Sequence, residues 1–198
     1  MEKLRARDYR IAAKNKCSKY SDTLALIYVL HAIITAAVAG ASFGLLAILV
    51  TGPLALGIAM ICEEVDQERP LNVEKLFAGF NNFGRAFVLE LLTGIYLFLW
   101  SLLIIPVFIK IYSYSMSVYI LKDNPDMSAD ECITMSRKIM NGHKWELFCL
   151  EFSYIGWIIL CILTFGILSF WVSPKMQQAK YLFYLHITEK DSQVIEEY

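Results

Sequence analysis

Residues 104–128, IIPVFIKIYSYSMSVYILKDNPDMS, join two apolar runs and decide how the rest of the chain is interpreted. The first run breaks at Pro106. The second run carries serines and tyrosines and stops at the turn Asp123–Asp126. Because proline disrupts a helix interior and restricts the residue before it, the pattern predicts a chain that reverses direction at a membrane face and returns as a second apolar helix.

Residues 107–122 are interpreted as one helix, which at about 1.5 Å per residue reaches roughly 24 Å, a little short of a hydrocarbon core. Four polar side chains have the spacing of a single helical face: Lys110, Ser113, Tyr114 and Ser117. This polar stripe is expected to contact other helices or a cavity, since lipid cannot hydrogen-bond it. Hydrogen bonding between helices is the interpretation that we favour, and a path for a solute is the alternative.

The composition indicates a membrane protein. Of the 198 residues, 57% are hydrophobic, above the roughly 45–50% typical of soluble domains. The net charge of −1 gives no indication of nucleic-acid binding. The five cysteines have neither paired nor metal-ligand spacing, so we expect no disulfide framework, no metal site and no cofactor. The sequence contains no zinc-protease motif and no phosphate-binding glycine loop, and we predict no catalytic residue and no enzymatic activity.

The N-terminal segment is strongly basic. Seven basic residues precede the first apolar run: Lys3, Arg5, Arg7, Arg10, Lys14, Lys16 and Lys19. Their number predicts a cytoplasmic N-terminus. A weakly amphipathic helical pattern, suited to the inner membrane surface, runs through Leu4, Tyr9, Ile11 and Ala12. Ala37–Ala39 imitates the cleavage site of a signal peptide, but the apolar run continues beyond it, so we expect an uncleaved first span.

The apolar runs predict six membrane helices. The first two, at about 22–40 and 43–63, meet at a turn of small residues, and Pro53 is expected to kink the second. His31, in the first, is interpreted as a packed, hydrogen-bonded residue. The other four are expected at about 86–105, 107–122, 146–168 and 175–188. The first half of the last helix is polar, so it either packs inside the bundle or lies on the surface, which would leave five spans.

Short amphipathic helices are expected ahead of the hairpins, in the membrane interface. Asn72 is interpreted as the N-cap of one, which Asn81–Asn82 breaks, and residues 63–70 before it are expected to be exposed. Another starts at the capping box Ser128–Glu131 and ends at Asn141–Gly142. Its successor, the fifth span, is expected to end at a turn framed by Phe165–Gly166 and Ser173–Pro174.

The sequence also contains an internal repeat. Phe-Val-Leu-Glu at 87–90 and Phe-Cys-Leu-Glu at 148–151 match, and each follows a short amphipathic helix and leads through an apolar span to a proline. We therefore predict a single all-α, polytopic membrane domain over residues 1–198. It would contain three helical-hairpin units, each preceded by an interfacial helix, at about 4–70, 71–126 and 127–190.

Glu90 and Glu151 end the two matching segments and are the best candidates for charges inside the membrane. A lone carboxylate in hydrocarbon is strongly unfavourable, so a partner is expected for each. Basic residues of the interfacial helices are the candidates, among them Lys75, Arg137 and Lys138. We expect each glutamate to tie its span to an interfacial helix of another unit, and coupling to an ion or a proton is the alternative.

Several segments carry a family resemblance: Lys110–Met116 after Pro106, Tyr119–Leu121, Asp123–Pro125, Asn141–Trp145 and Ser153–Trp157. Together they resemble a family of bacterial integral membrane proteins that is catalogued as domain of unknown function 975. The resemblance covers nearly the whole chain and is strongest from about residue 104 to 170. It implies a multi-pass protein of the bacterial cytoplasmic membrane, and it implies no activity and no catalytic residue.

Three functional classes remain open. Small size and short loops favour a non-enzymatic membrane scaffold or accessory protein, whose partners would be the lipid bilayer and a second copy or another membrane protein. The second class is a small-solute or ion transporter or channel, using Glu90, Glu151 and the polar stripe. A lipid-acting enzyme is the least supported of the three.

Overall fold

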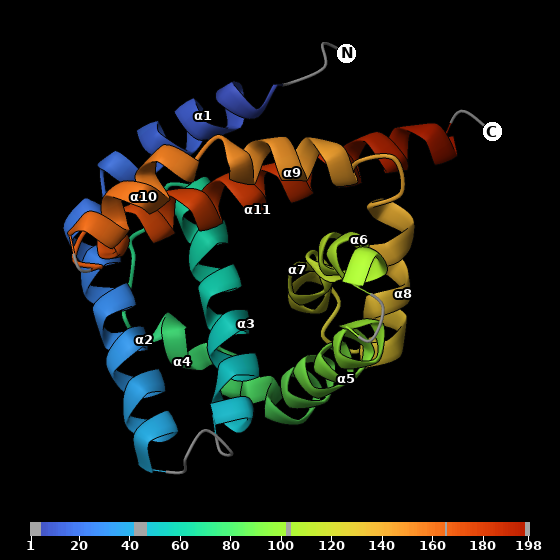
Figure 1. The fold of residues 1–198 in the computed structure, drawn as a ribbon, viewed down its shortest axis with the longest axis horizontal. Helices are drawn as coiled ribbons and strands as arrows, with labels where there is room; N and C mark the ends of the chain where they lie inside the picture. Colours follow the sequence, from blue (N-terminus) through green and yellow to red (C-terminus); the bar gives the residue numbers. More distant parts are fainter. Residues whose placement is uncertain (1–4, 42–46, 102–103, 165, 197–198) are drawn as a thin grey trace. The chain divides into compact units, whose positions relative to one another are not determined.

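The computed structural model describes residues 5–41, 47–101, 104–164 and 166–196, and every regular element in these ranges is a helix (Figure 1). The predicted all-α class is therefore confirmed. The elements are α1 (Ala6–Ser18), α2 (Ser21–Ala41), α3 (Ala47–Asp66), α4 (Lys75–Ala78), the 3-10 helix η1 (Gly79–Asn82), α5 (Phe83–Ser101), α6 (Ile104–Tyr114), α7 (Ser117–Asp123), α8 (Ala129–Ile139), α9 (Lys144–Phe152), α10 (Ile155–Leu163) and α11 (Ser169–Glu196).

Three helical stretches in the described part of the chain are long and apolar enough to cross a membrane: Ser21–Gly40, Lys75–Trp100 and Lys144–Leu163. They correspond to the first, third and fifth predicted spans. Large apolar side chains on these stretches are exposed, among them Leu26, Phe98 and Ile162. Such a surface is costly in water and suits contact with lipid, so by length and composition these helices are compatible with a membrane protein. The count of six spans stays a prediction.

The single central helix predicted over residues 107–122 is wrong, because α6 and α7 are separate helices there. Pro106, which was expected at a break, lies in the first turn of α6. Proline is tolerated in a first turn because the N–H groups of that turn have no partner within the helix. α5 ends at Ser101 and α6 begins at Ile104, and residues 102–103 lie outside the described ranges.

The fifth predicted span is divided as well. α9 ends at Phe152 and α10 begins at Ile155. Between them the hydroxyl group of Ser153 donates to the carbonyl oxygen of Leu150 at 2.6 Å, a local bond of the kind that competes with the helical ladder. The following turn contains Gly166, whose φ of +83° favours glycine. Pro174, expected in that turn, lies inside α11.

The predicted helix ends are confirmed around α8. The hydroxyl group of Ser128 accepts from the backbone N–H of Glu131 at 3.4 Å, and the Glu131 carboxylate accepts from the N–H of Ser128 at 2.9 Å. The Ser128 hydroxyl group also donates to the Glu131 carboxylate at 2.7 Å, and this bond, together with the one from the Ser128 N–H, holds the pKa of the Glu131 carboxyl below its ordinary value. Gly142, with φ of +87°, follows the end of the helix. Both signals are local in sequence, which is why they could be predicted.

The interfacial helix that was predicted to begin after Asn72 is shorter than expected. Asn72 accepts from the N–H of Glu74 at 3.1 Å, and α4 begins only at Lys75. The break expected at Asn81–Asn82 is a 3-10 turn that leads directly into α5. The acidic stretch at residues 63–70 was expected to be exposed, but it begins inside α3, where Glu64 is buried.

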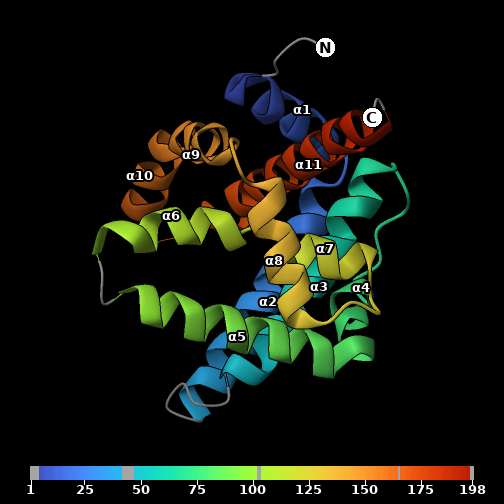
Figure 2. The same ribbon diagram turned by 90° about the vertical axis from the view of Figure 1, so that its right-hand side faces the viewer.

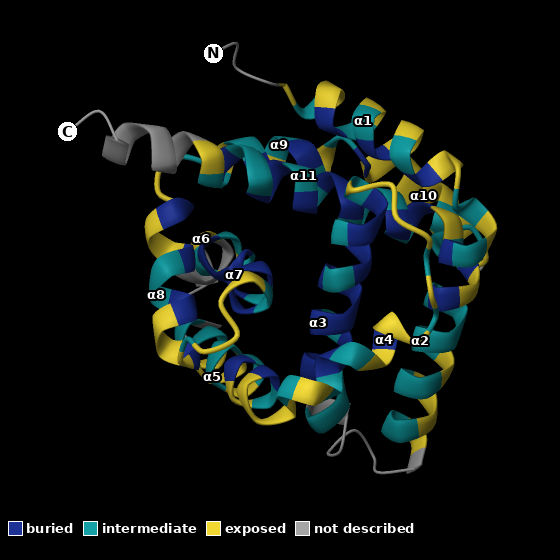
Figure 3. Cartoon of the chain, turned by 180° about the vertical axis from the view of Figure 1, so that it is seen from behind, coloured by how far each residue is buried: buried dark blue, intermediate teal, exposed yellow. Residues whose placement is uncertain are grey.

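The chain divides into two compact units. The terminal unit comprises residues 1–30, 62–71 and 145–198, and the central unit comprises residues 31–61 and 72–144. In the terminal unit α1 packs along α11 (Figures 1 and 3). The buried face of α1 is the stripe Tyr9, Ala13 and Cys17, and the ring of Tyr9 lies 5.5 Å from that of Phe183. Of the apolar residues predicted for this face, Ile11 is exposed and Leu4 lies outside the described residues.

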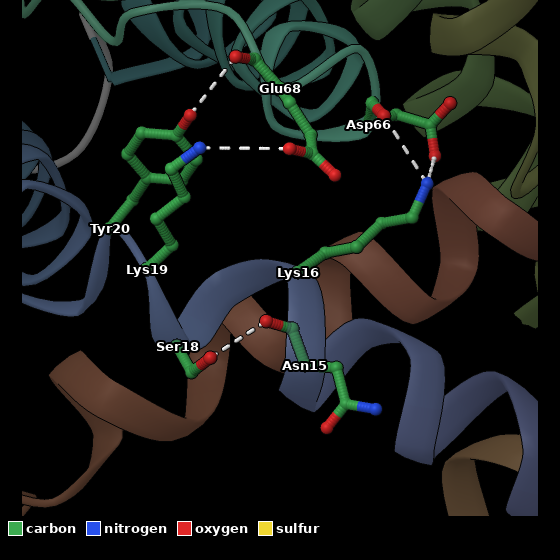
Figure 4. Close-up of polar contacts among 7 residues, drawn as sticks. All are labelled: Asn15, Lys16, Ser18, Lys19, Tyr20, Asp66 and Glu68. Carbon is green, nitrogen blue, oxygen red and sulfur yellow. Dashed lines mark hydrogen bonds and ion pairs between the residues drawn. The ribbon is translucent and has the colours of Figure 1, made fainter.

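Polar contacts fix the end of α1 against the end of α3 within the terminal unit (Figure 4). Lys16 Nζ lies 2.5 Å from Asp66 Oδ1, and Lys19 Nζ lies 3.6 Å from Glu68 Oε2. The hydroxyl group of Tyr20 donates to the carbonyl oxygen of Glu68 at 3.1 Å. Among the described cations of the N-terminal segment, Lys16 and Lys19 therefore lie in ion pairs.

In the central unit α8 packs against α5, α6 and α7 (Figure 2), and α4 and η1 lie against α3. A Cβ added at Gly57 of α3 would overlap the backbone of Leu76, and one added at Gly79 would overlap the carbonyl group of Pro53. These backbones meet closely because both residues are glycine.

Each helix that was predicted to lie in the membrane interface packs on a hairpin of another predicted unit. The helix α1 precedes the first hairpin and packs on α11 of the third. The segment α4–η1 precedes the second hairpin and lies on α3 of the first, and α8 precedes the third and packs on helices of the second. Whether the three units are repeats stays a prediction.

Candidate functional site

The polar stripe predicted on one helix is divided between two. Ser113 and Tyr114 are buried in α6, Ser117 is buried in α7, and Lys110 is half-buried. The hydroxyl group of Ser113 donates to the carbonyl oxygen of Ile109 at 2.8 Å, and that of Ser117 donates to the carbonyl oxygen of Tyr114 at 2.5 Å. Ser113 therefore bonds within α6, whereas Ser117 of α7 bonds to the last residue of α6.

Ser136 of α8, which the sequence analysis did not select, joins the two pieces. Its hydroxyl group donates to the carbonyl oxygen of Ser113 at 2.8 Å and accepts from the backbone N–H of Met116 at 3.3 Å. In a continuous helix those two backbone groups would pair with residues four positions away. Ser136 replaces these partners, which explains how the gap between α6 and α7 is tolerated in a buried position.

A signal for Ser136 was present in the sequence. The buried residues of α8 are Ala129, Cys132, Ile133, Ser136 and Ile139, which share one face of an amphipathic helix. Ser136 is the only hydroxyl residue in this buried set, and its relative exposure is 0%. A buried hydroxyl group usually has a hydrogen-bond partner. A serine on this otherwise apolar face therefore indicated a specific contact with another segment.

The central basic cavity, of about 350 Å³, lies beside the same break. Its lining brings together four cations and three neutral polar residues: Lys110, Arg137, Lys138, Lys144, Ser113, Thr134 and Asn141. No carboxylate is among these lining residues. Lys110 Nζ also lies 4.5 Å from the ring centroid of Trp100, a cation–π contact. Lys110 and Ser113 of the polar stripe are thus placed together with Arg137 and Lys138, which were expected to pair with glutamates.

The two predicted glutamates have different environments. Glu151 Oε1 of α9 lies 2.6 Å from Lys180 Nζ of α11, and both side chains are partly buried. Glu90 of α5 is half-buried beside Gly52 of α3, and within the described part of the chain it makes no hydrogen bond and no ion pair. Lys180 was not among the expected partners and belongs to a long helix rather than to an interfacial one.

His31 of α2 is half-buried, and the carbonyl group of the same residue accepts from the hydroxyl group of Thr35 at 2.7 Å. Its Nδ1 atom is buried without a hydrogen-bond partner among the residues that the structure describes. In the same residues, no group of three or more His, Cys, Asp or Glu side chains is arranged to hold a metal ion.

Comparison with known proteins gives one match. Residues 102–191 match the family described as Protein of unknown function (DUF975), which confirms the resemblance predicted from the sequence. The matched segment includes α6 to α10 and all the residues that line the central basic cavity, whereas residues 1–101, over which a weaker resemblance was expected, lie outside it. No curated protein and no solved structure matched the chain.

Proposed function

We propose, from the match of residues 102–191 to a family of unknown function, that this chain is a multi-pass protein of the bacterial cytoplasmic membrane that acts as a non-enzymatic scaffold or accessory protein. The observation that carries the proposal is the use of the polar stripe. Ser113 bonds within α6, Ser117 of α7 bonds to the last residue of α6, and Ser136 of α8 bonds across to the same break. The hydroxyl groups of Ser117 and Ser136 hold helices together, and hydroxyl groups occupied in this way are not free to bind a passing solute.

The packing of the interfacial helices supports the same proposal. Each of α1, α4–η1 and α8 rests on a hairpin of another predicted unit. Surface helices that pack on neighbouring hairpins restrict the movement of those hairpins relative to one another. Alternating access requires such movement. Its exposed apolar side chains leave a broad surface for lipid, for a second copy or for another membrane protein.

The proposed orientation places the N-terminus in the cytoplasm, on the basis of the seven basic residues ahead of the first apolar run. Single cysteines labelled from outside intact cells test it. Labelling should fail at residues 1–20 and 123–143 and succeed near residue 40. Labelling within 123–143 would contradict the hairpin arrangement, whereas labelling at 190–198 would move only the last helix.

A transporter is the second candidate, and Glu90 is the observation that favours it. A half-buried carboxylate without an ion pair or hydrogen bond in the described residues is the type of group that couples to a proton or a cation. The transporter would use Glu90, and the scaffold would require only the structural pair Glu151–Lys180.

The two candidates are separated by Glu90→Gln and Glu151→Gln, with Glu189→Gln, an exposed residue of α11, as a charge-matched control. For a scaffold, Glu151→Gln should lower the thermal stability in detergent, Glu90→Gln should not, and proteoliposomes of all variants should show the same ion and proton flux as protein-free vesicles. A flux in the wild type that is lost only in Glu90→Gln would replace the scaffold with the transporter.

A further inference from the structure

A second basic cavity lies in the terminal unit, between α1, α10 and α11, and we refer to it as the terminal basic cavity. It has a volume of about 390 Å³. Its lining is Arg7, Arg10, Ile11, Lys14, Tyr154, Trp157, Val172 and Lys175. The sequence analysis selected none of these residues as a site, because they come from the two ends of the chain.

The cations of this cavity are positioned by the fold. Arg7, Arg10 and Lys14 lie at i, i+3 and i+7 of α1 and so share one face, beside the stripe that packs on α11. Nη1 of Arg10 donates to the carbonyl oxygen of Ser153 at 2.7 Å. The hydroxyl group of Tyr154 donates to the carbonyl oxygen of Lys175 at 3.3 Å, which joins the start of α10 to α11.

The positive charge in the cavity is not neutralised by the described residues. No carboxylate is among the lining residues, and in the described part of the chain Arg7, Lys14 and Lys175 form no ion pair. By contrast, Lys16 and Lys19, on other faces of the same segment, are paired with Asp66 and Glu68. Four cations around one void repel each other, and a bound anion removes that repulsion.

The remaining lining residues indicate what carries the anion. Ile11, Val172 and Trp157 make up the apolar part of the lining, and Trp157 is 47% exposed on the candidate span Lys144–Leu163. Tryptophan and tyrosine prefer the level of lipid headgroups, where one end of the side chain is apolar and the other is hydrated. The central basic cavity has a comparable set of cations but no such apolar side, since its other lining residues are Ser113, Thr134 and Asn141.

We propose that the terminal basic cavity binds the phosphate group of an anionic phospholipid, with the headgroup among Arg7, Arg10, Lys14 and Lys175 and an acyl chain against Ile11 and Trp157. Arginine is well suited to the phosphate because its planar guanidinium group donates two parallel hydrogen bonds. The inference rests on the proposed membrane location of the chain. Lipid binding in detergent is nevertheless measured independently of membrane orientation and of transport. A protein that does not bind the phospholipid would therefore overturn this inference and leave the scaffold proposal standing.

The test measures thermal unfolding of the full chain in detergent against increasing concentrations of short-chain phosphatidylglycerol, short-chain phosphatidylcholine or inorganic phosphate. We expect phosphatidylglycerol to raise the Tm, and the other two to have little effect at equal concentration. In the double variant Arg7→Gln and Lys14→Gln the apparent affinity for phosphatidylglycerol should fall on the order of thirtyfold, from the loss of two cations near an anionic headgroup.

The control is the double variant Arg5→Gln and Lys19→Gln, which removes the same charge from the same segment but outside the cavity. It should retain the wild-type affinity. Arg7 and Lys14 are exposed, so their replacement leaves the packed stripe of α1 intact, and Lys175→Gln tests the cavity from α11. Trp157→Ala should weaken phosphatidylglycerol binding as well.

Three outcomes would overturn the proposal. An equal Tm shift with inorganic phosphate would identify a site for free phosphate, and an equal shift with phosphatidylcholine would show that charge is not recognised. An equal loss of affinity in the Arg5→Gln and Lys19→Gln control would show that the lipid responds to the overall charge of the segment rather than to the cavity.

Discussion

The hydroxyl group of Ser136 lies 2.8 Å from the carbonyl oxygen of Ser113, and this contact holds α8 to the end of α6. Ser136→Ala would remove the partner of that oxygen and of the Met116 N–H. Leaving buried polar groups unpaired should cost about 2 kcal/mol of unfolding free energy. Thermal or denaturant unfolding in detergent measures the loss. Ser18→Ala, an exposed serine that bonds to its own helix, is the control, and an equal effect of both changes would contradict the prediction.

Gly57 and Gly79 should tolerate no side chain. A methyl group at either position would overlap backbone atoms of the facing segment, which cannot move as a flexible side chain can. We expect Gly57→Ala and Gly79→Ala each to lower the unfolding free energy by about 1–3 kcal/mol, as overpacked sites do. Gly94→Ala on α5 is the matched control, because a Cβ there meets nothing within 4 Å. A Gly57→Ala protein as stable as Gly94→Ala would show that α3 and α4 do not pack in this way.

Glu68 should be replaceable by glycine with a gain in stability. It follows α3 with φ of +52°, and the N–H groups of Glu68 and Arg69 donate to the carbonyl oxygens of Val65 and Glu64, as in a Schellman motif. This position usually holds glycine, since a side chain at positive φ costs roughly 1 kcal/mol. The exposed pair with Lys19 contributes little, so Glu68→Gly should raise the unfolding free energy by about 1 kcal/mol. Lower stability in the variant would show that the pair outweighs the strain.

Cys17 should remain protonated in the folded protein at neutral and mildly alkaline pH. Burial against α11 raises the pKa of its thiol to about 12, from an ordinary value of 9.0, although nearby Lys175 acts in the opposite direction. The unfolded chain therefore loses this proton at lower pH than the folded chain. Stability from this group is complete below pH 9 and falls as the pH rises toward 12.

Alkylation with iodoacetamide at pH 8, followed by mass spectrometry of the Cys17 peptide, measures this directly. Modification should be far slower in the folded protein than after denaturation, since the thiolate is the reactive form. Equal rates in the two states would contradict the burial of Cys17 under α11.

Local signals predicted the parts of the fold that depend on neighbouring residues. The capping box at Ser128 and the glycine at 142 were predicted because their hydrogen bonds and backbone angles involve only a few residues. The break between α6 and α7 was not, because it depends on Ser136 in another helix, and a periodic polar stripe looks the same in one helix or in two. The partner of Glu151 was missed for the same reason: the choice between Lys180 and the interfacial cations is made by tertiary packing.

The basic cavities were beyond sequence reasoning for a further reason. Arg7 and Lys175 come together only because α1 packs on α11, and Lys110 meets Arg137 only because α8 packs beside α6. In the sequence, Arg7 is one of several cations of the N-terminal segment and Lys110 is one member of a polar stripe, and neither pattern names the cations that it will meet.

The packing of α1 on α11 also sets an order for biosynthesis. The helix α1 is translated before α2 to α10, and the helix that covers Tyr9, Ala13 and Cys17 is translated after them. Until α11 is made, this stripe lacks the helix on which it mainly packs, however completely the intervening helices have been inserted. A chain that stalls on the ribosome before α11 therefore carries an uncovered apolar face at its N-terminal end, where a protease or chaperone can distinguish it from a finished chain.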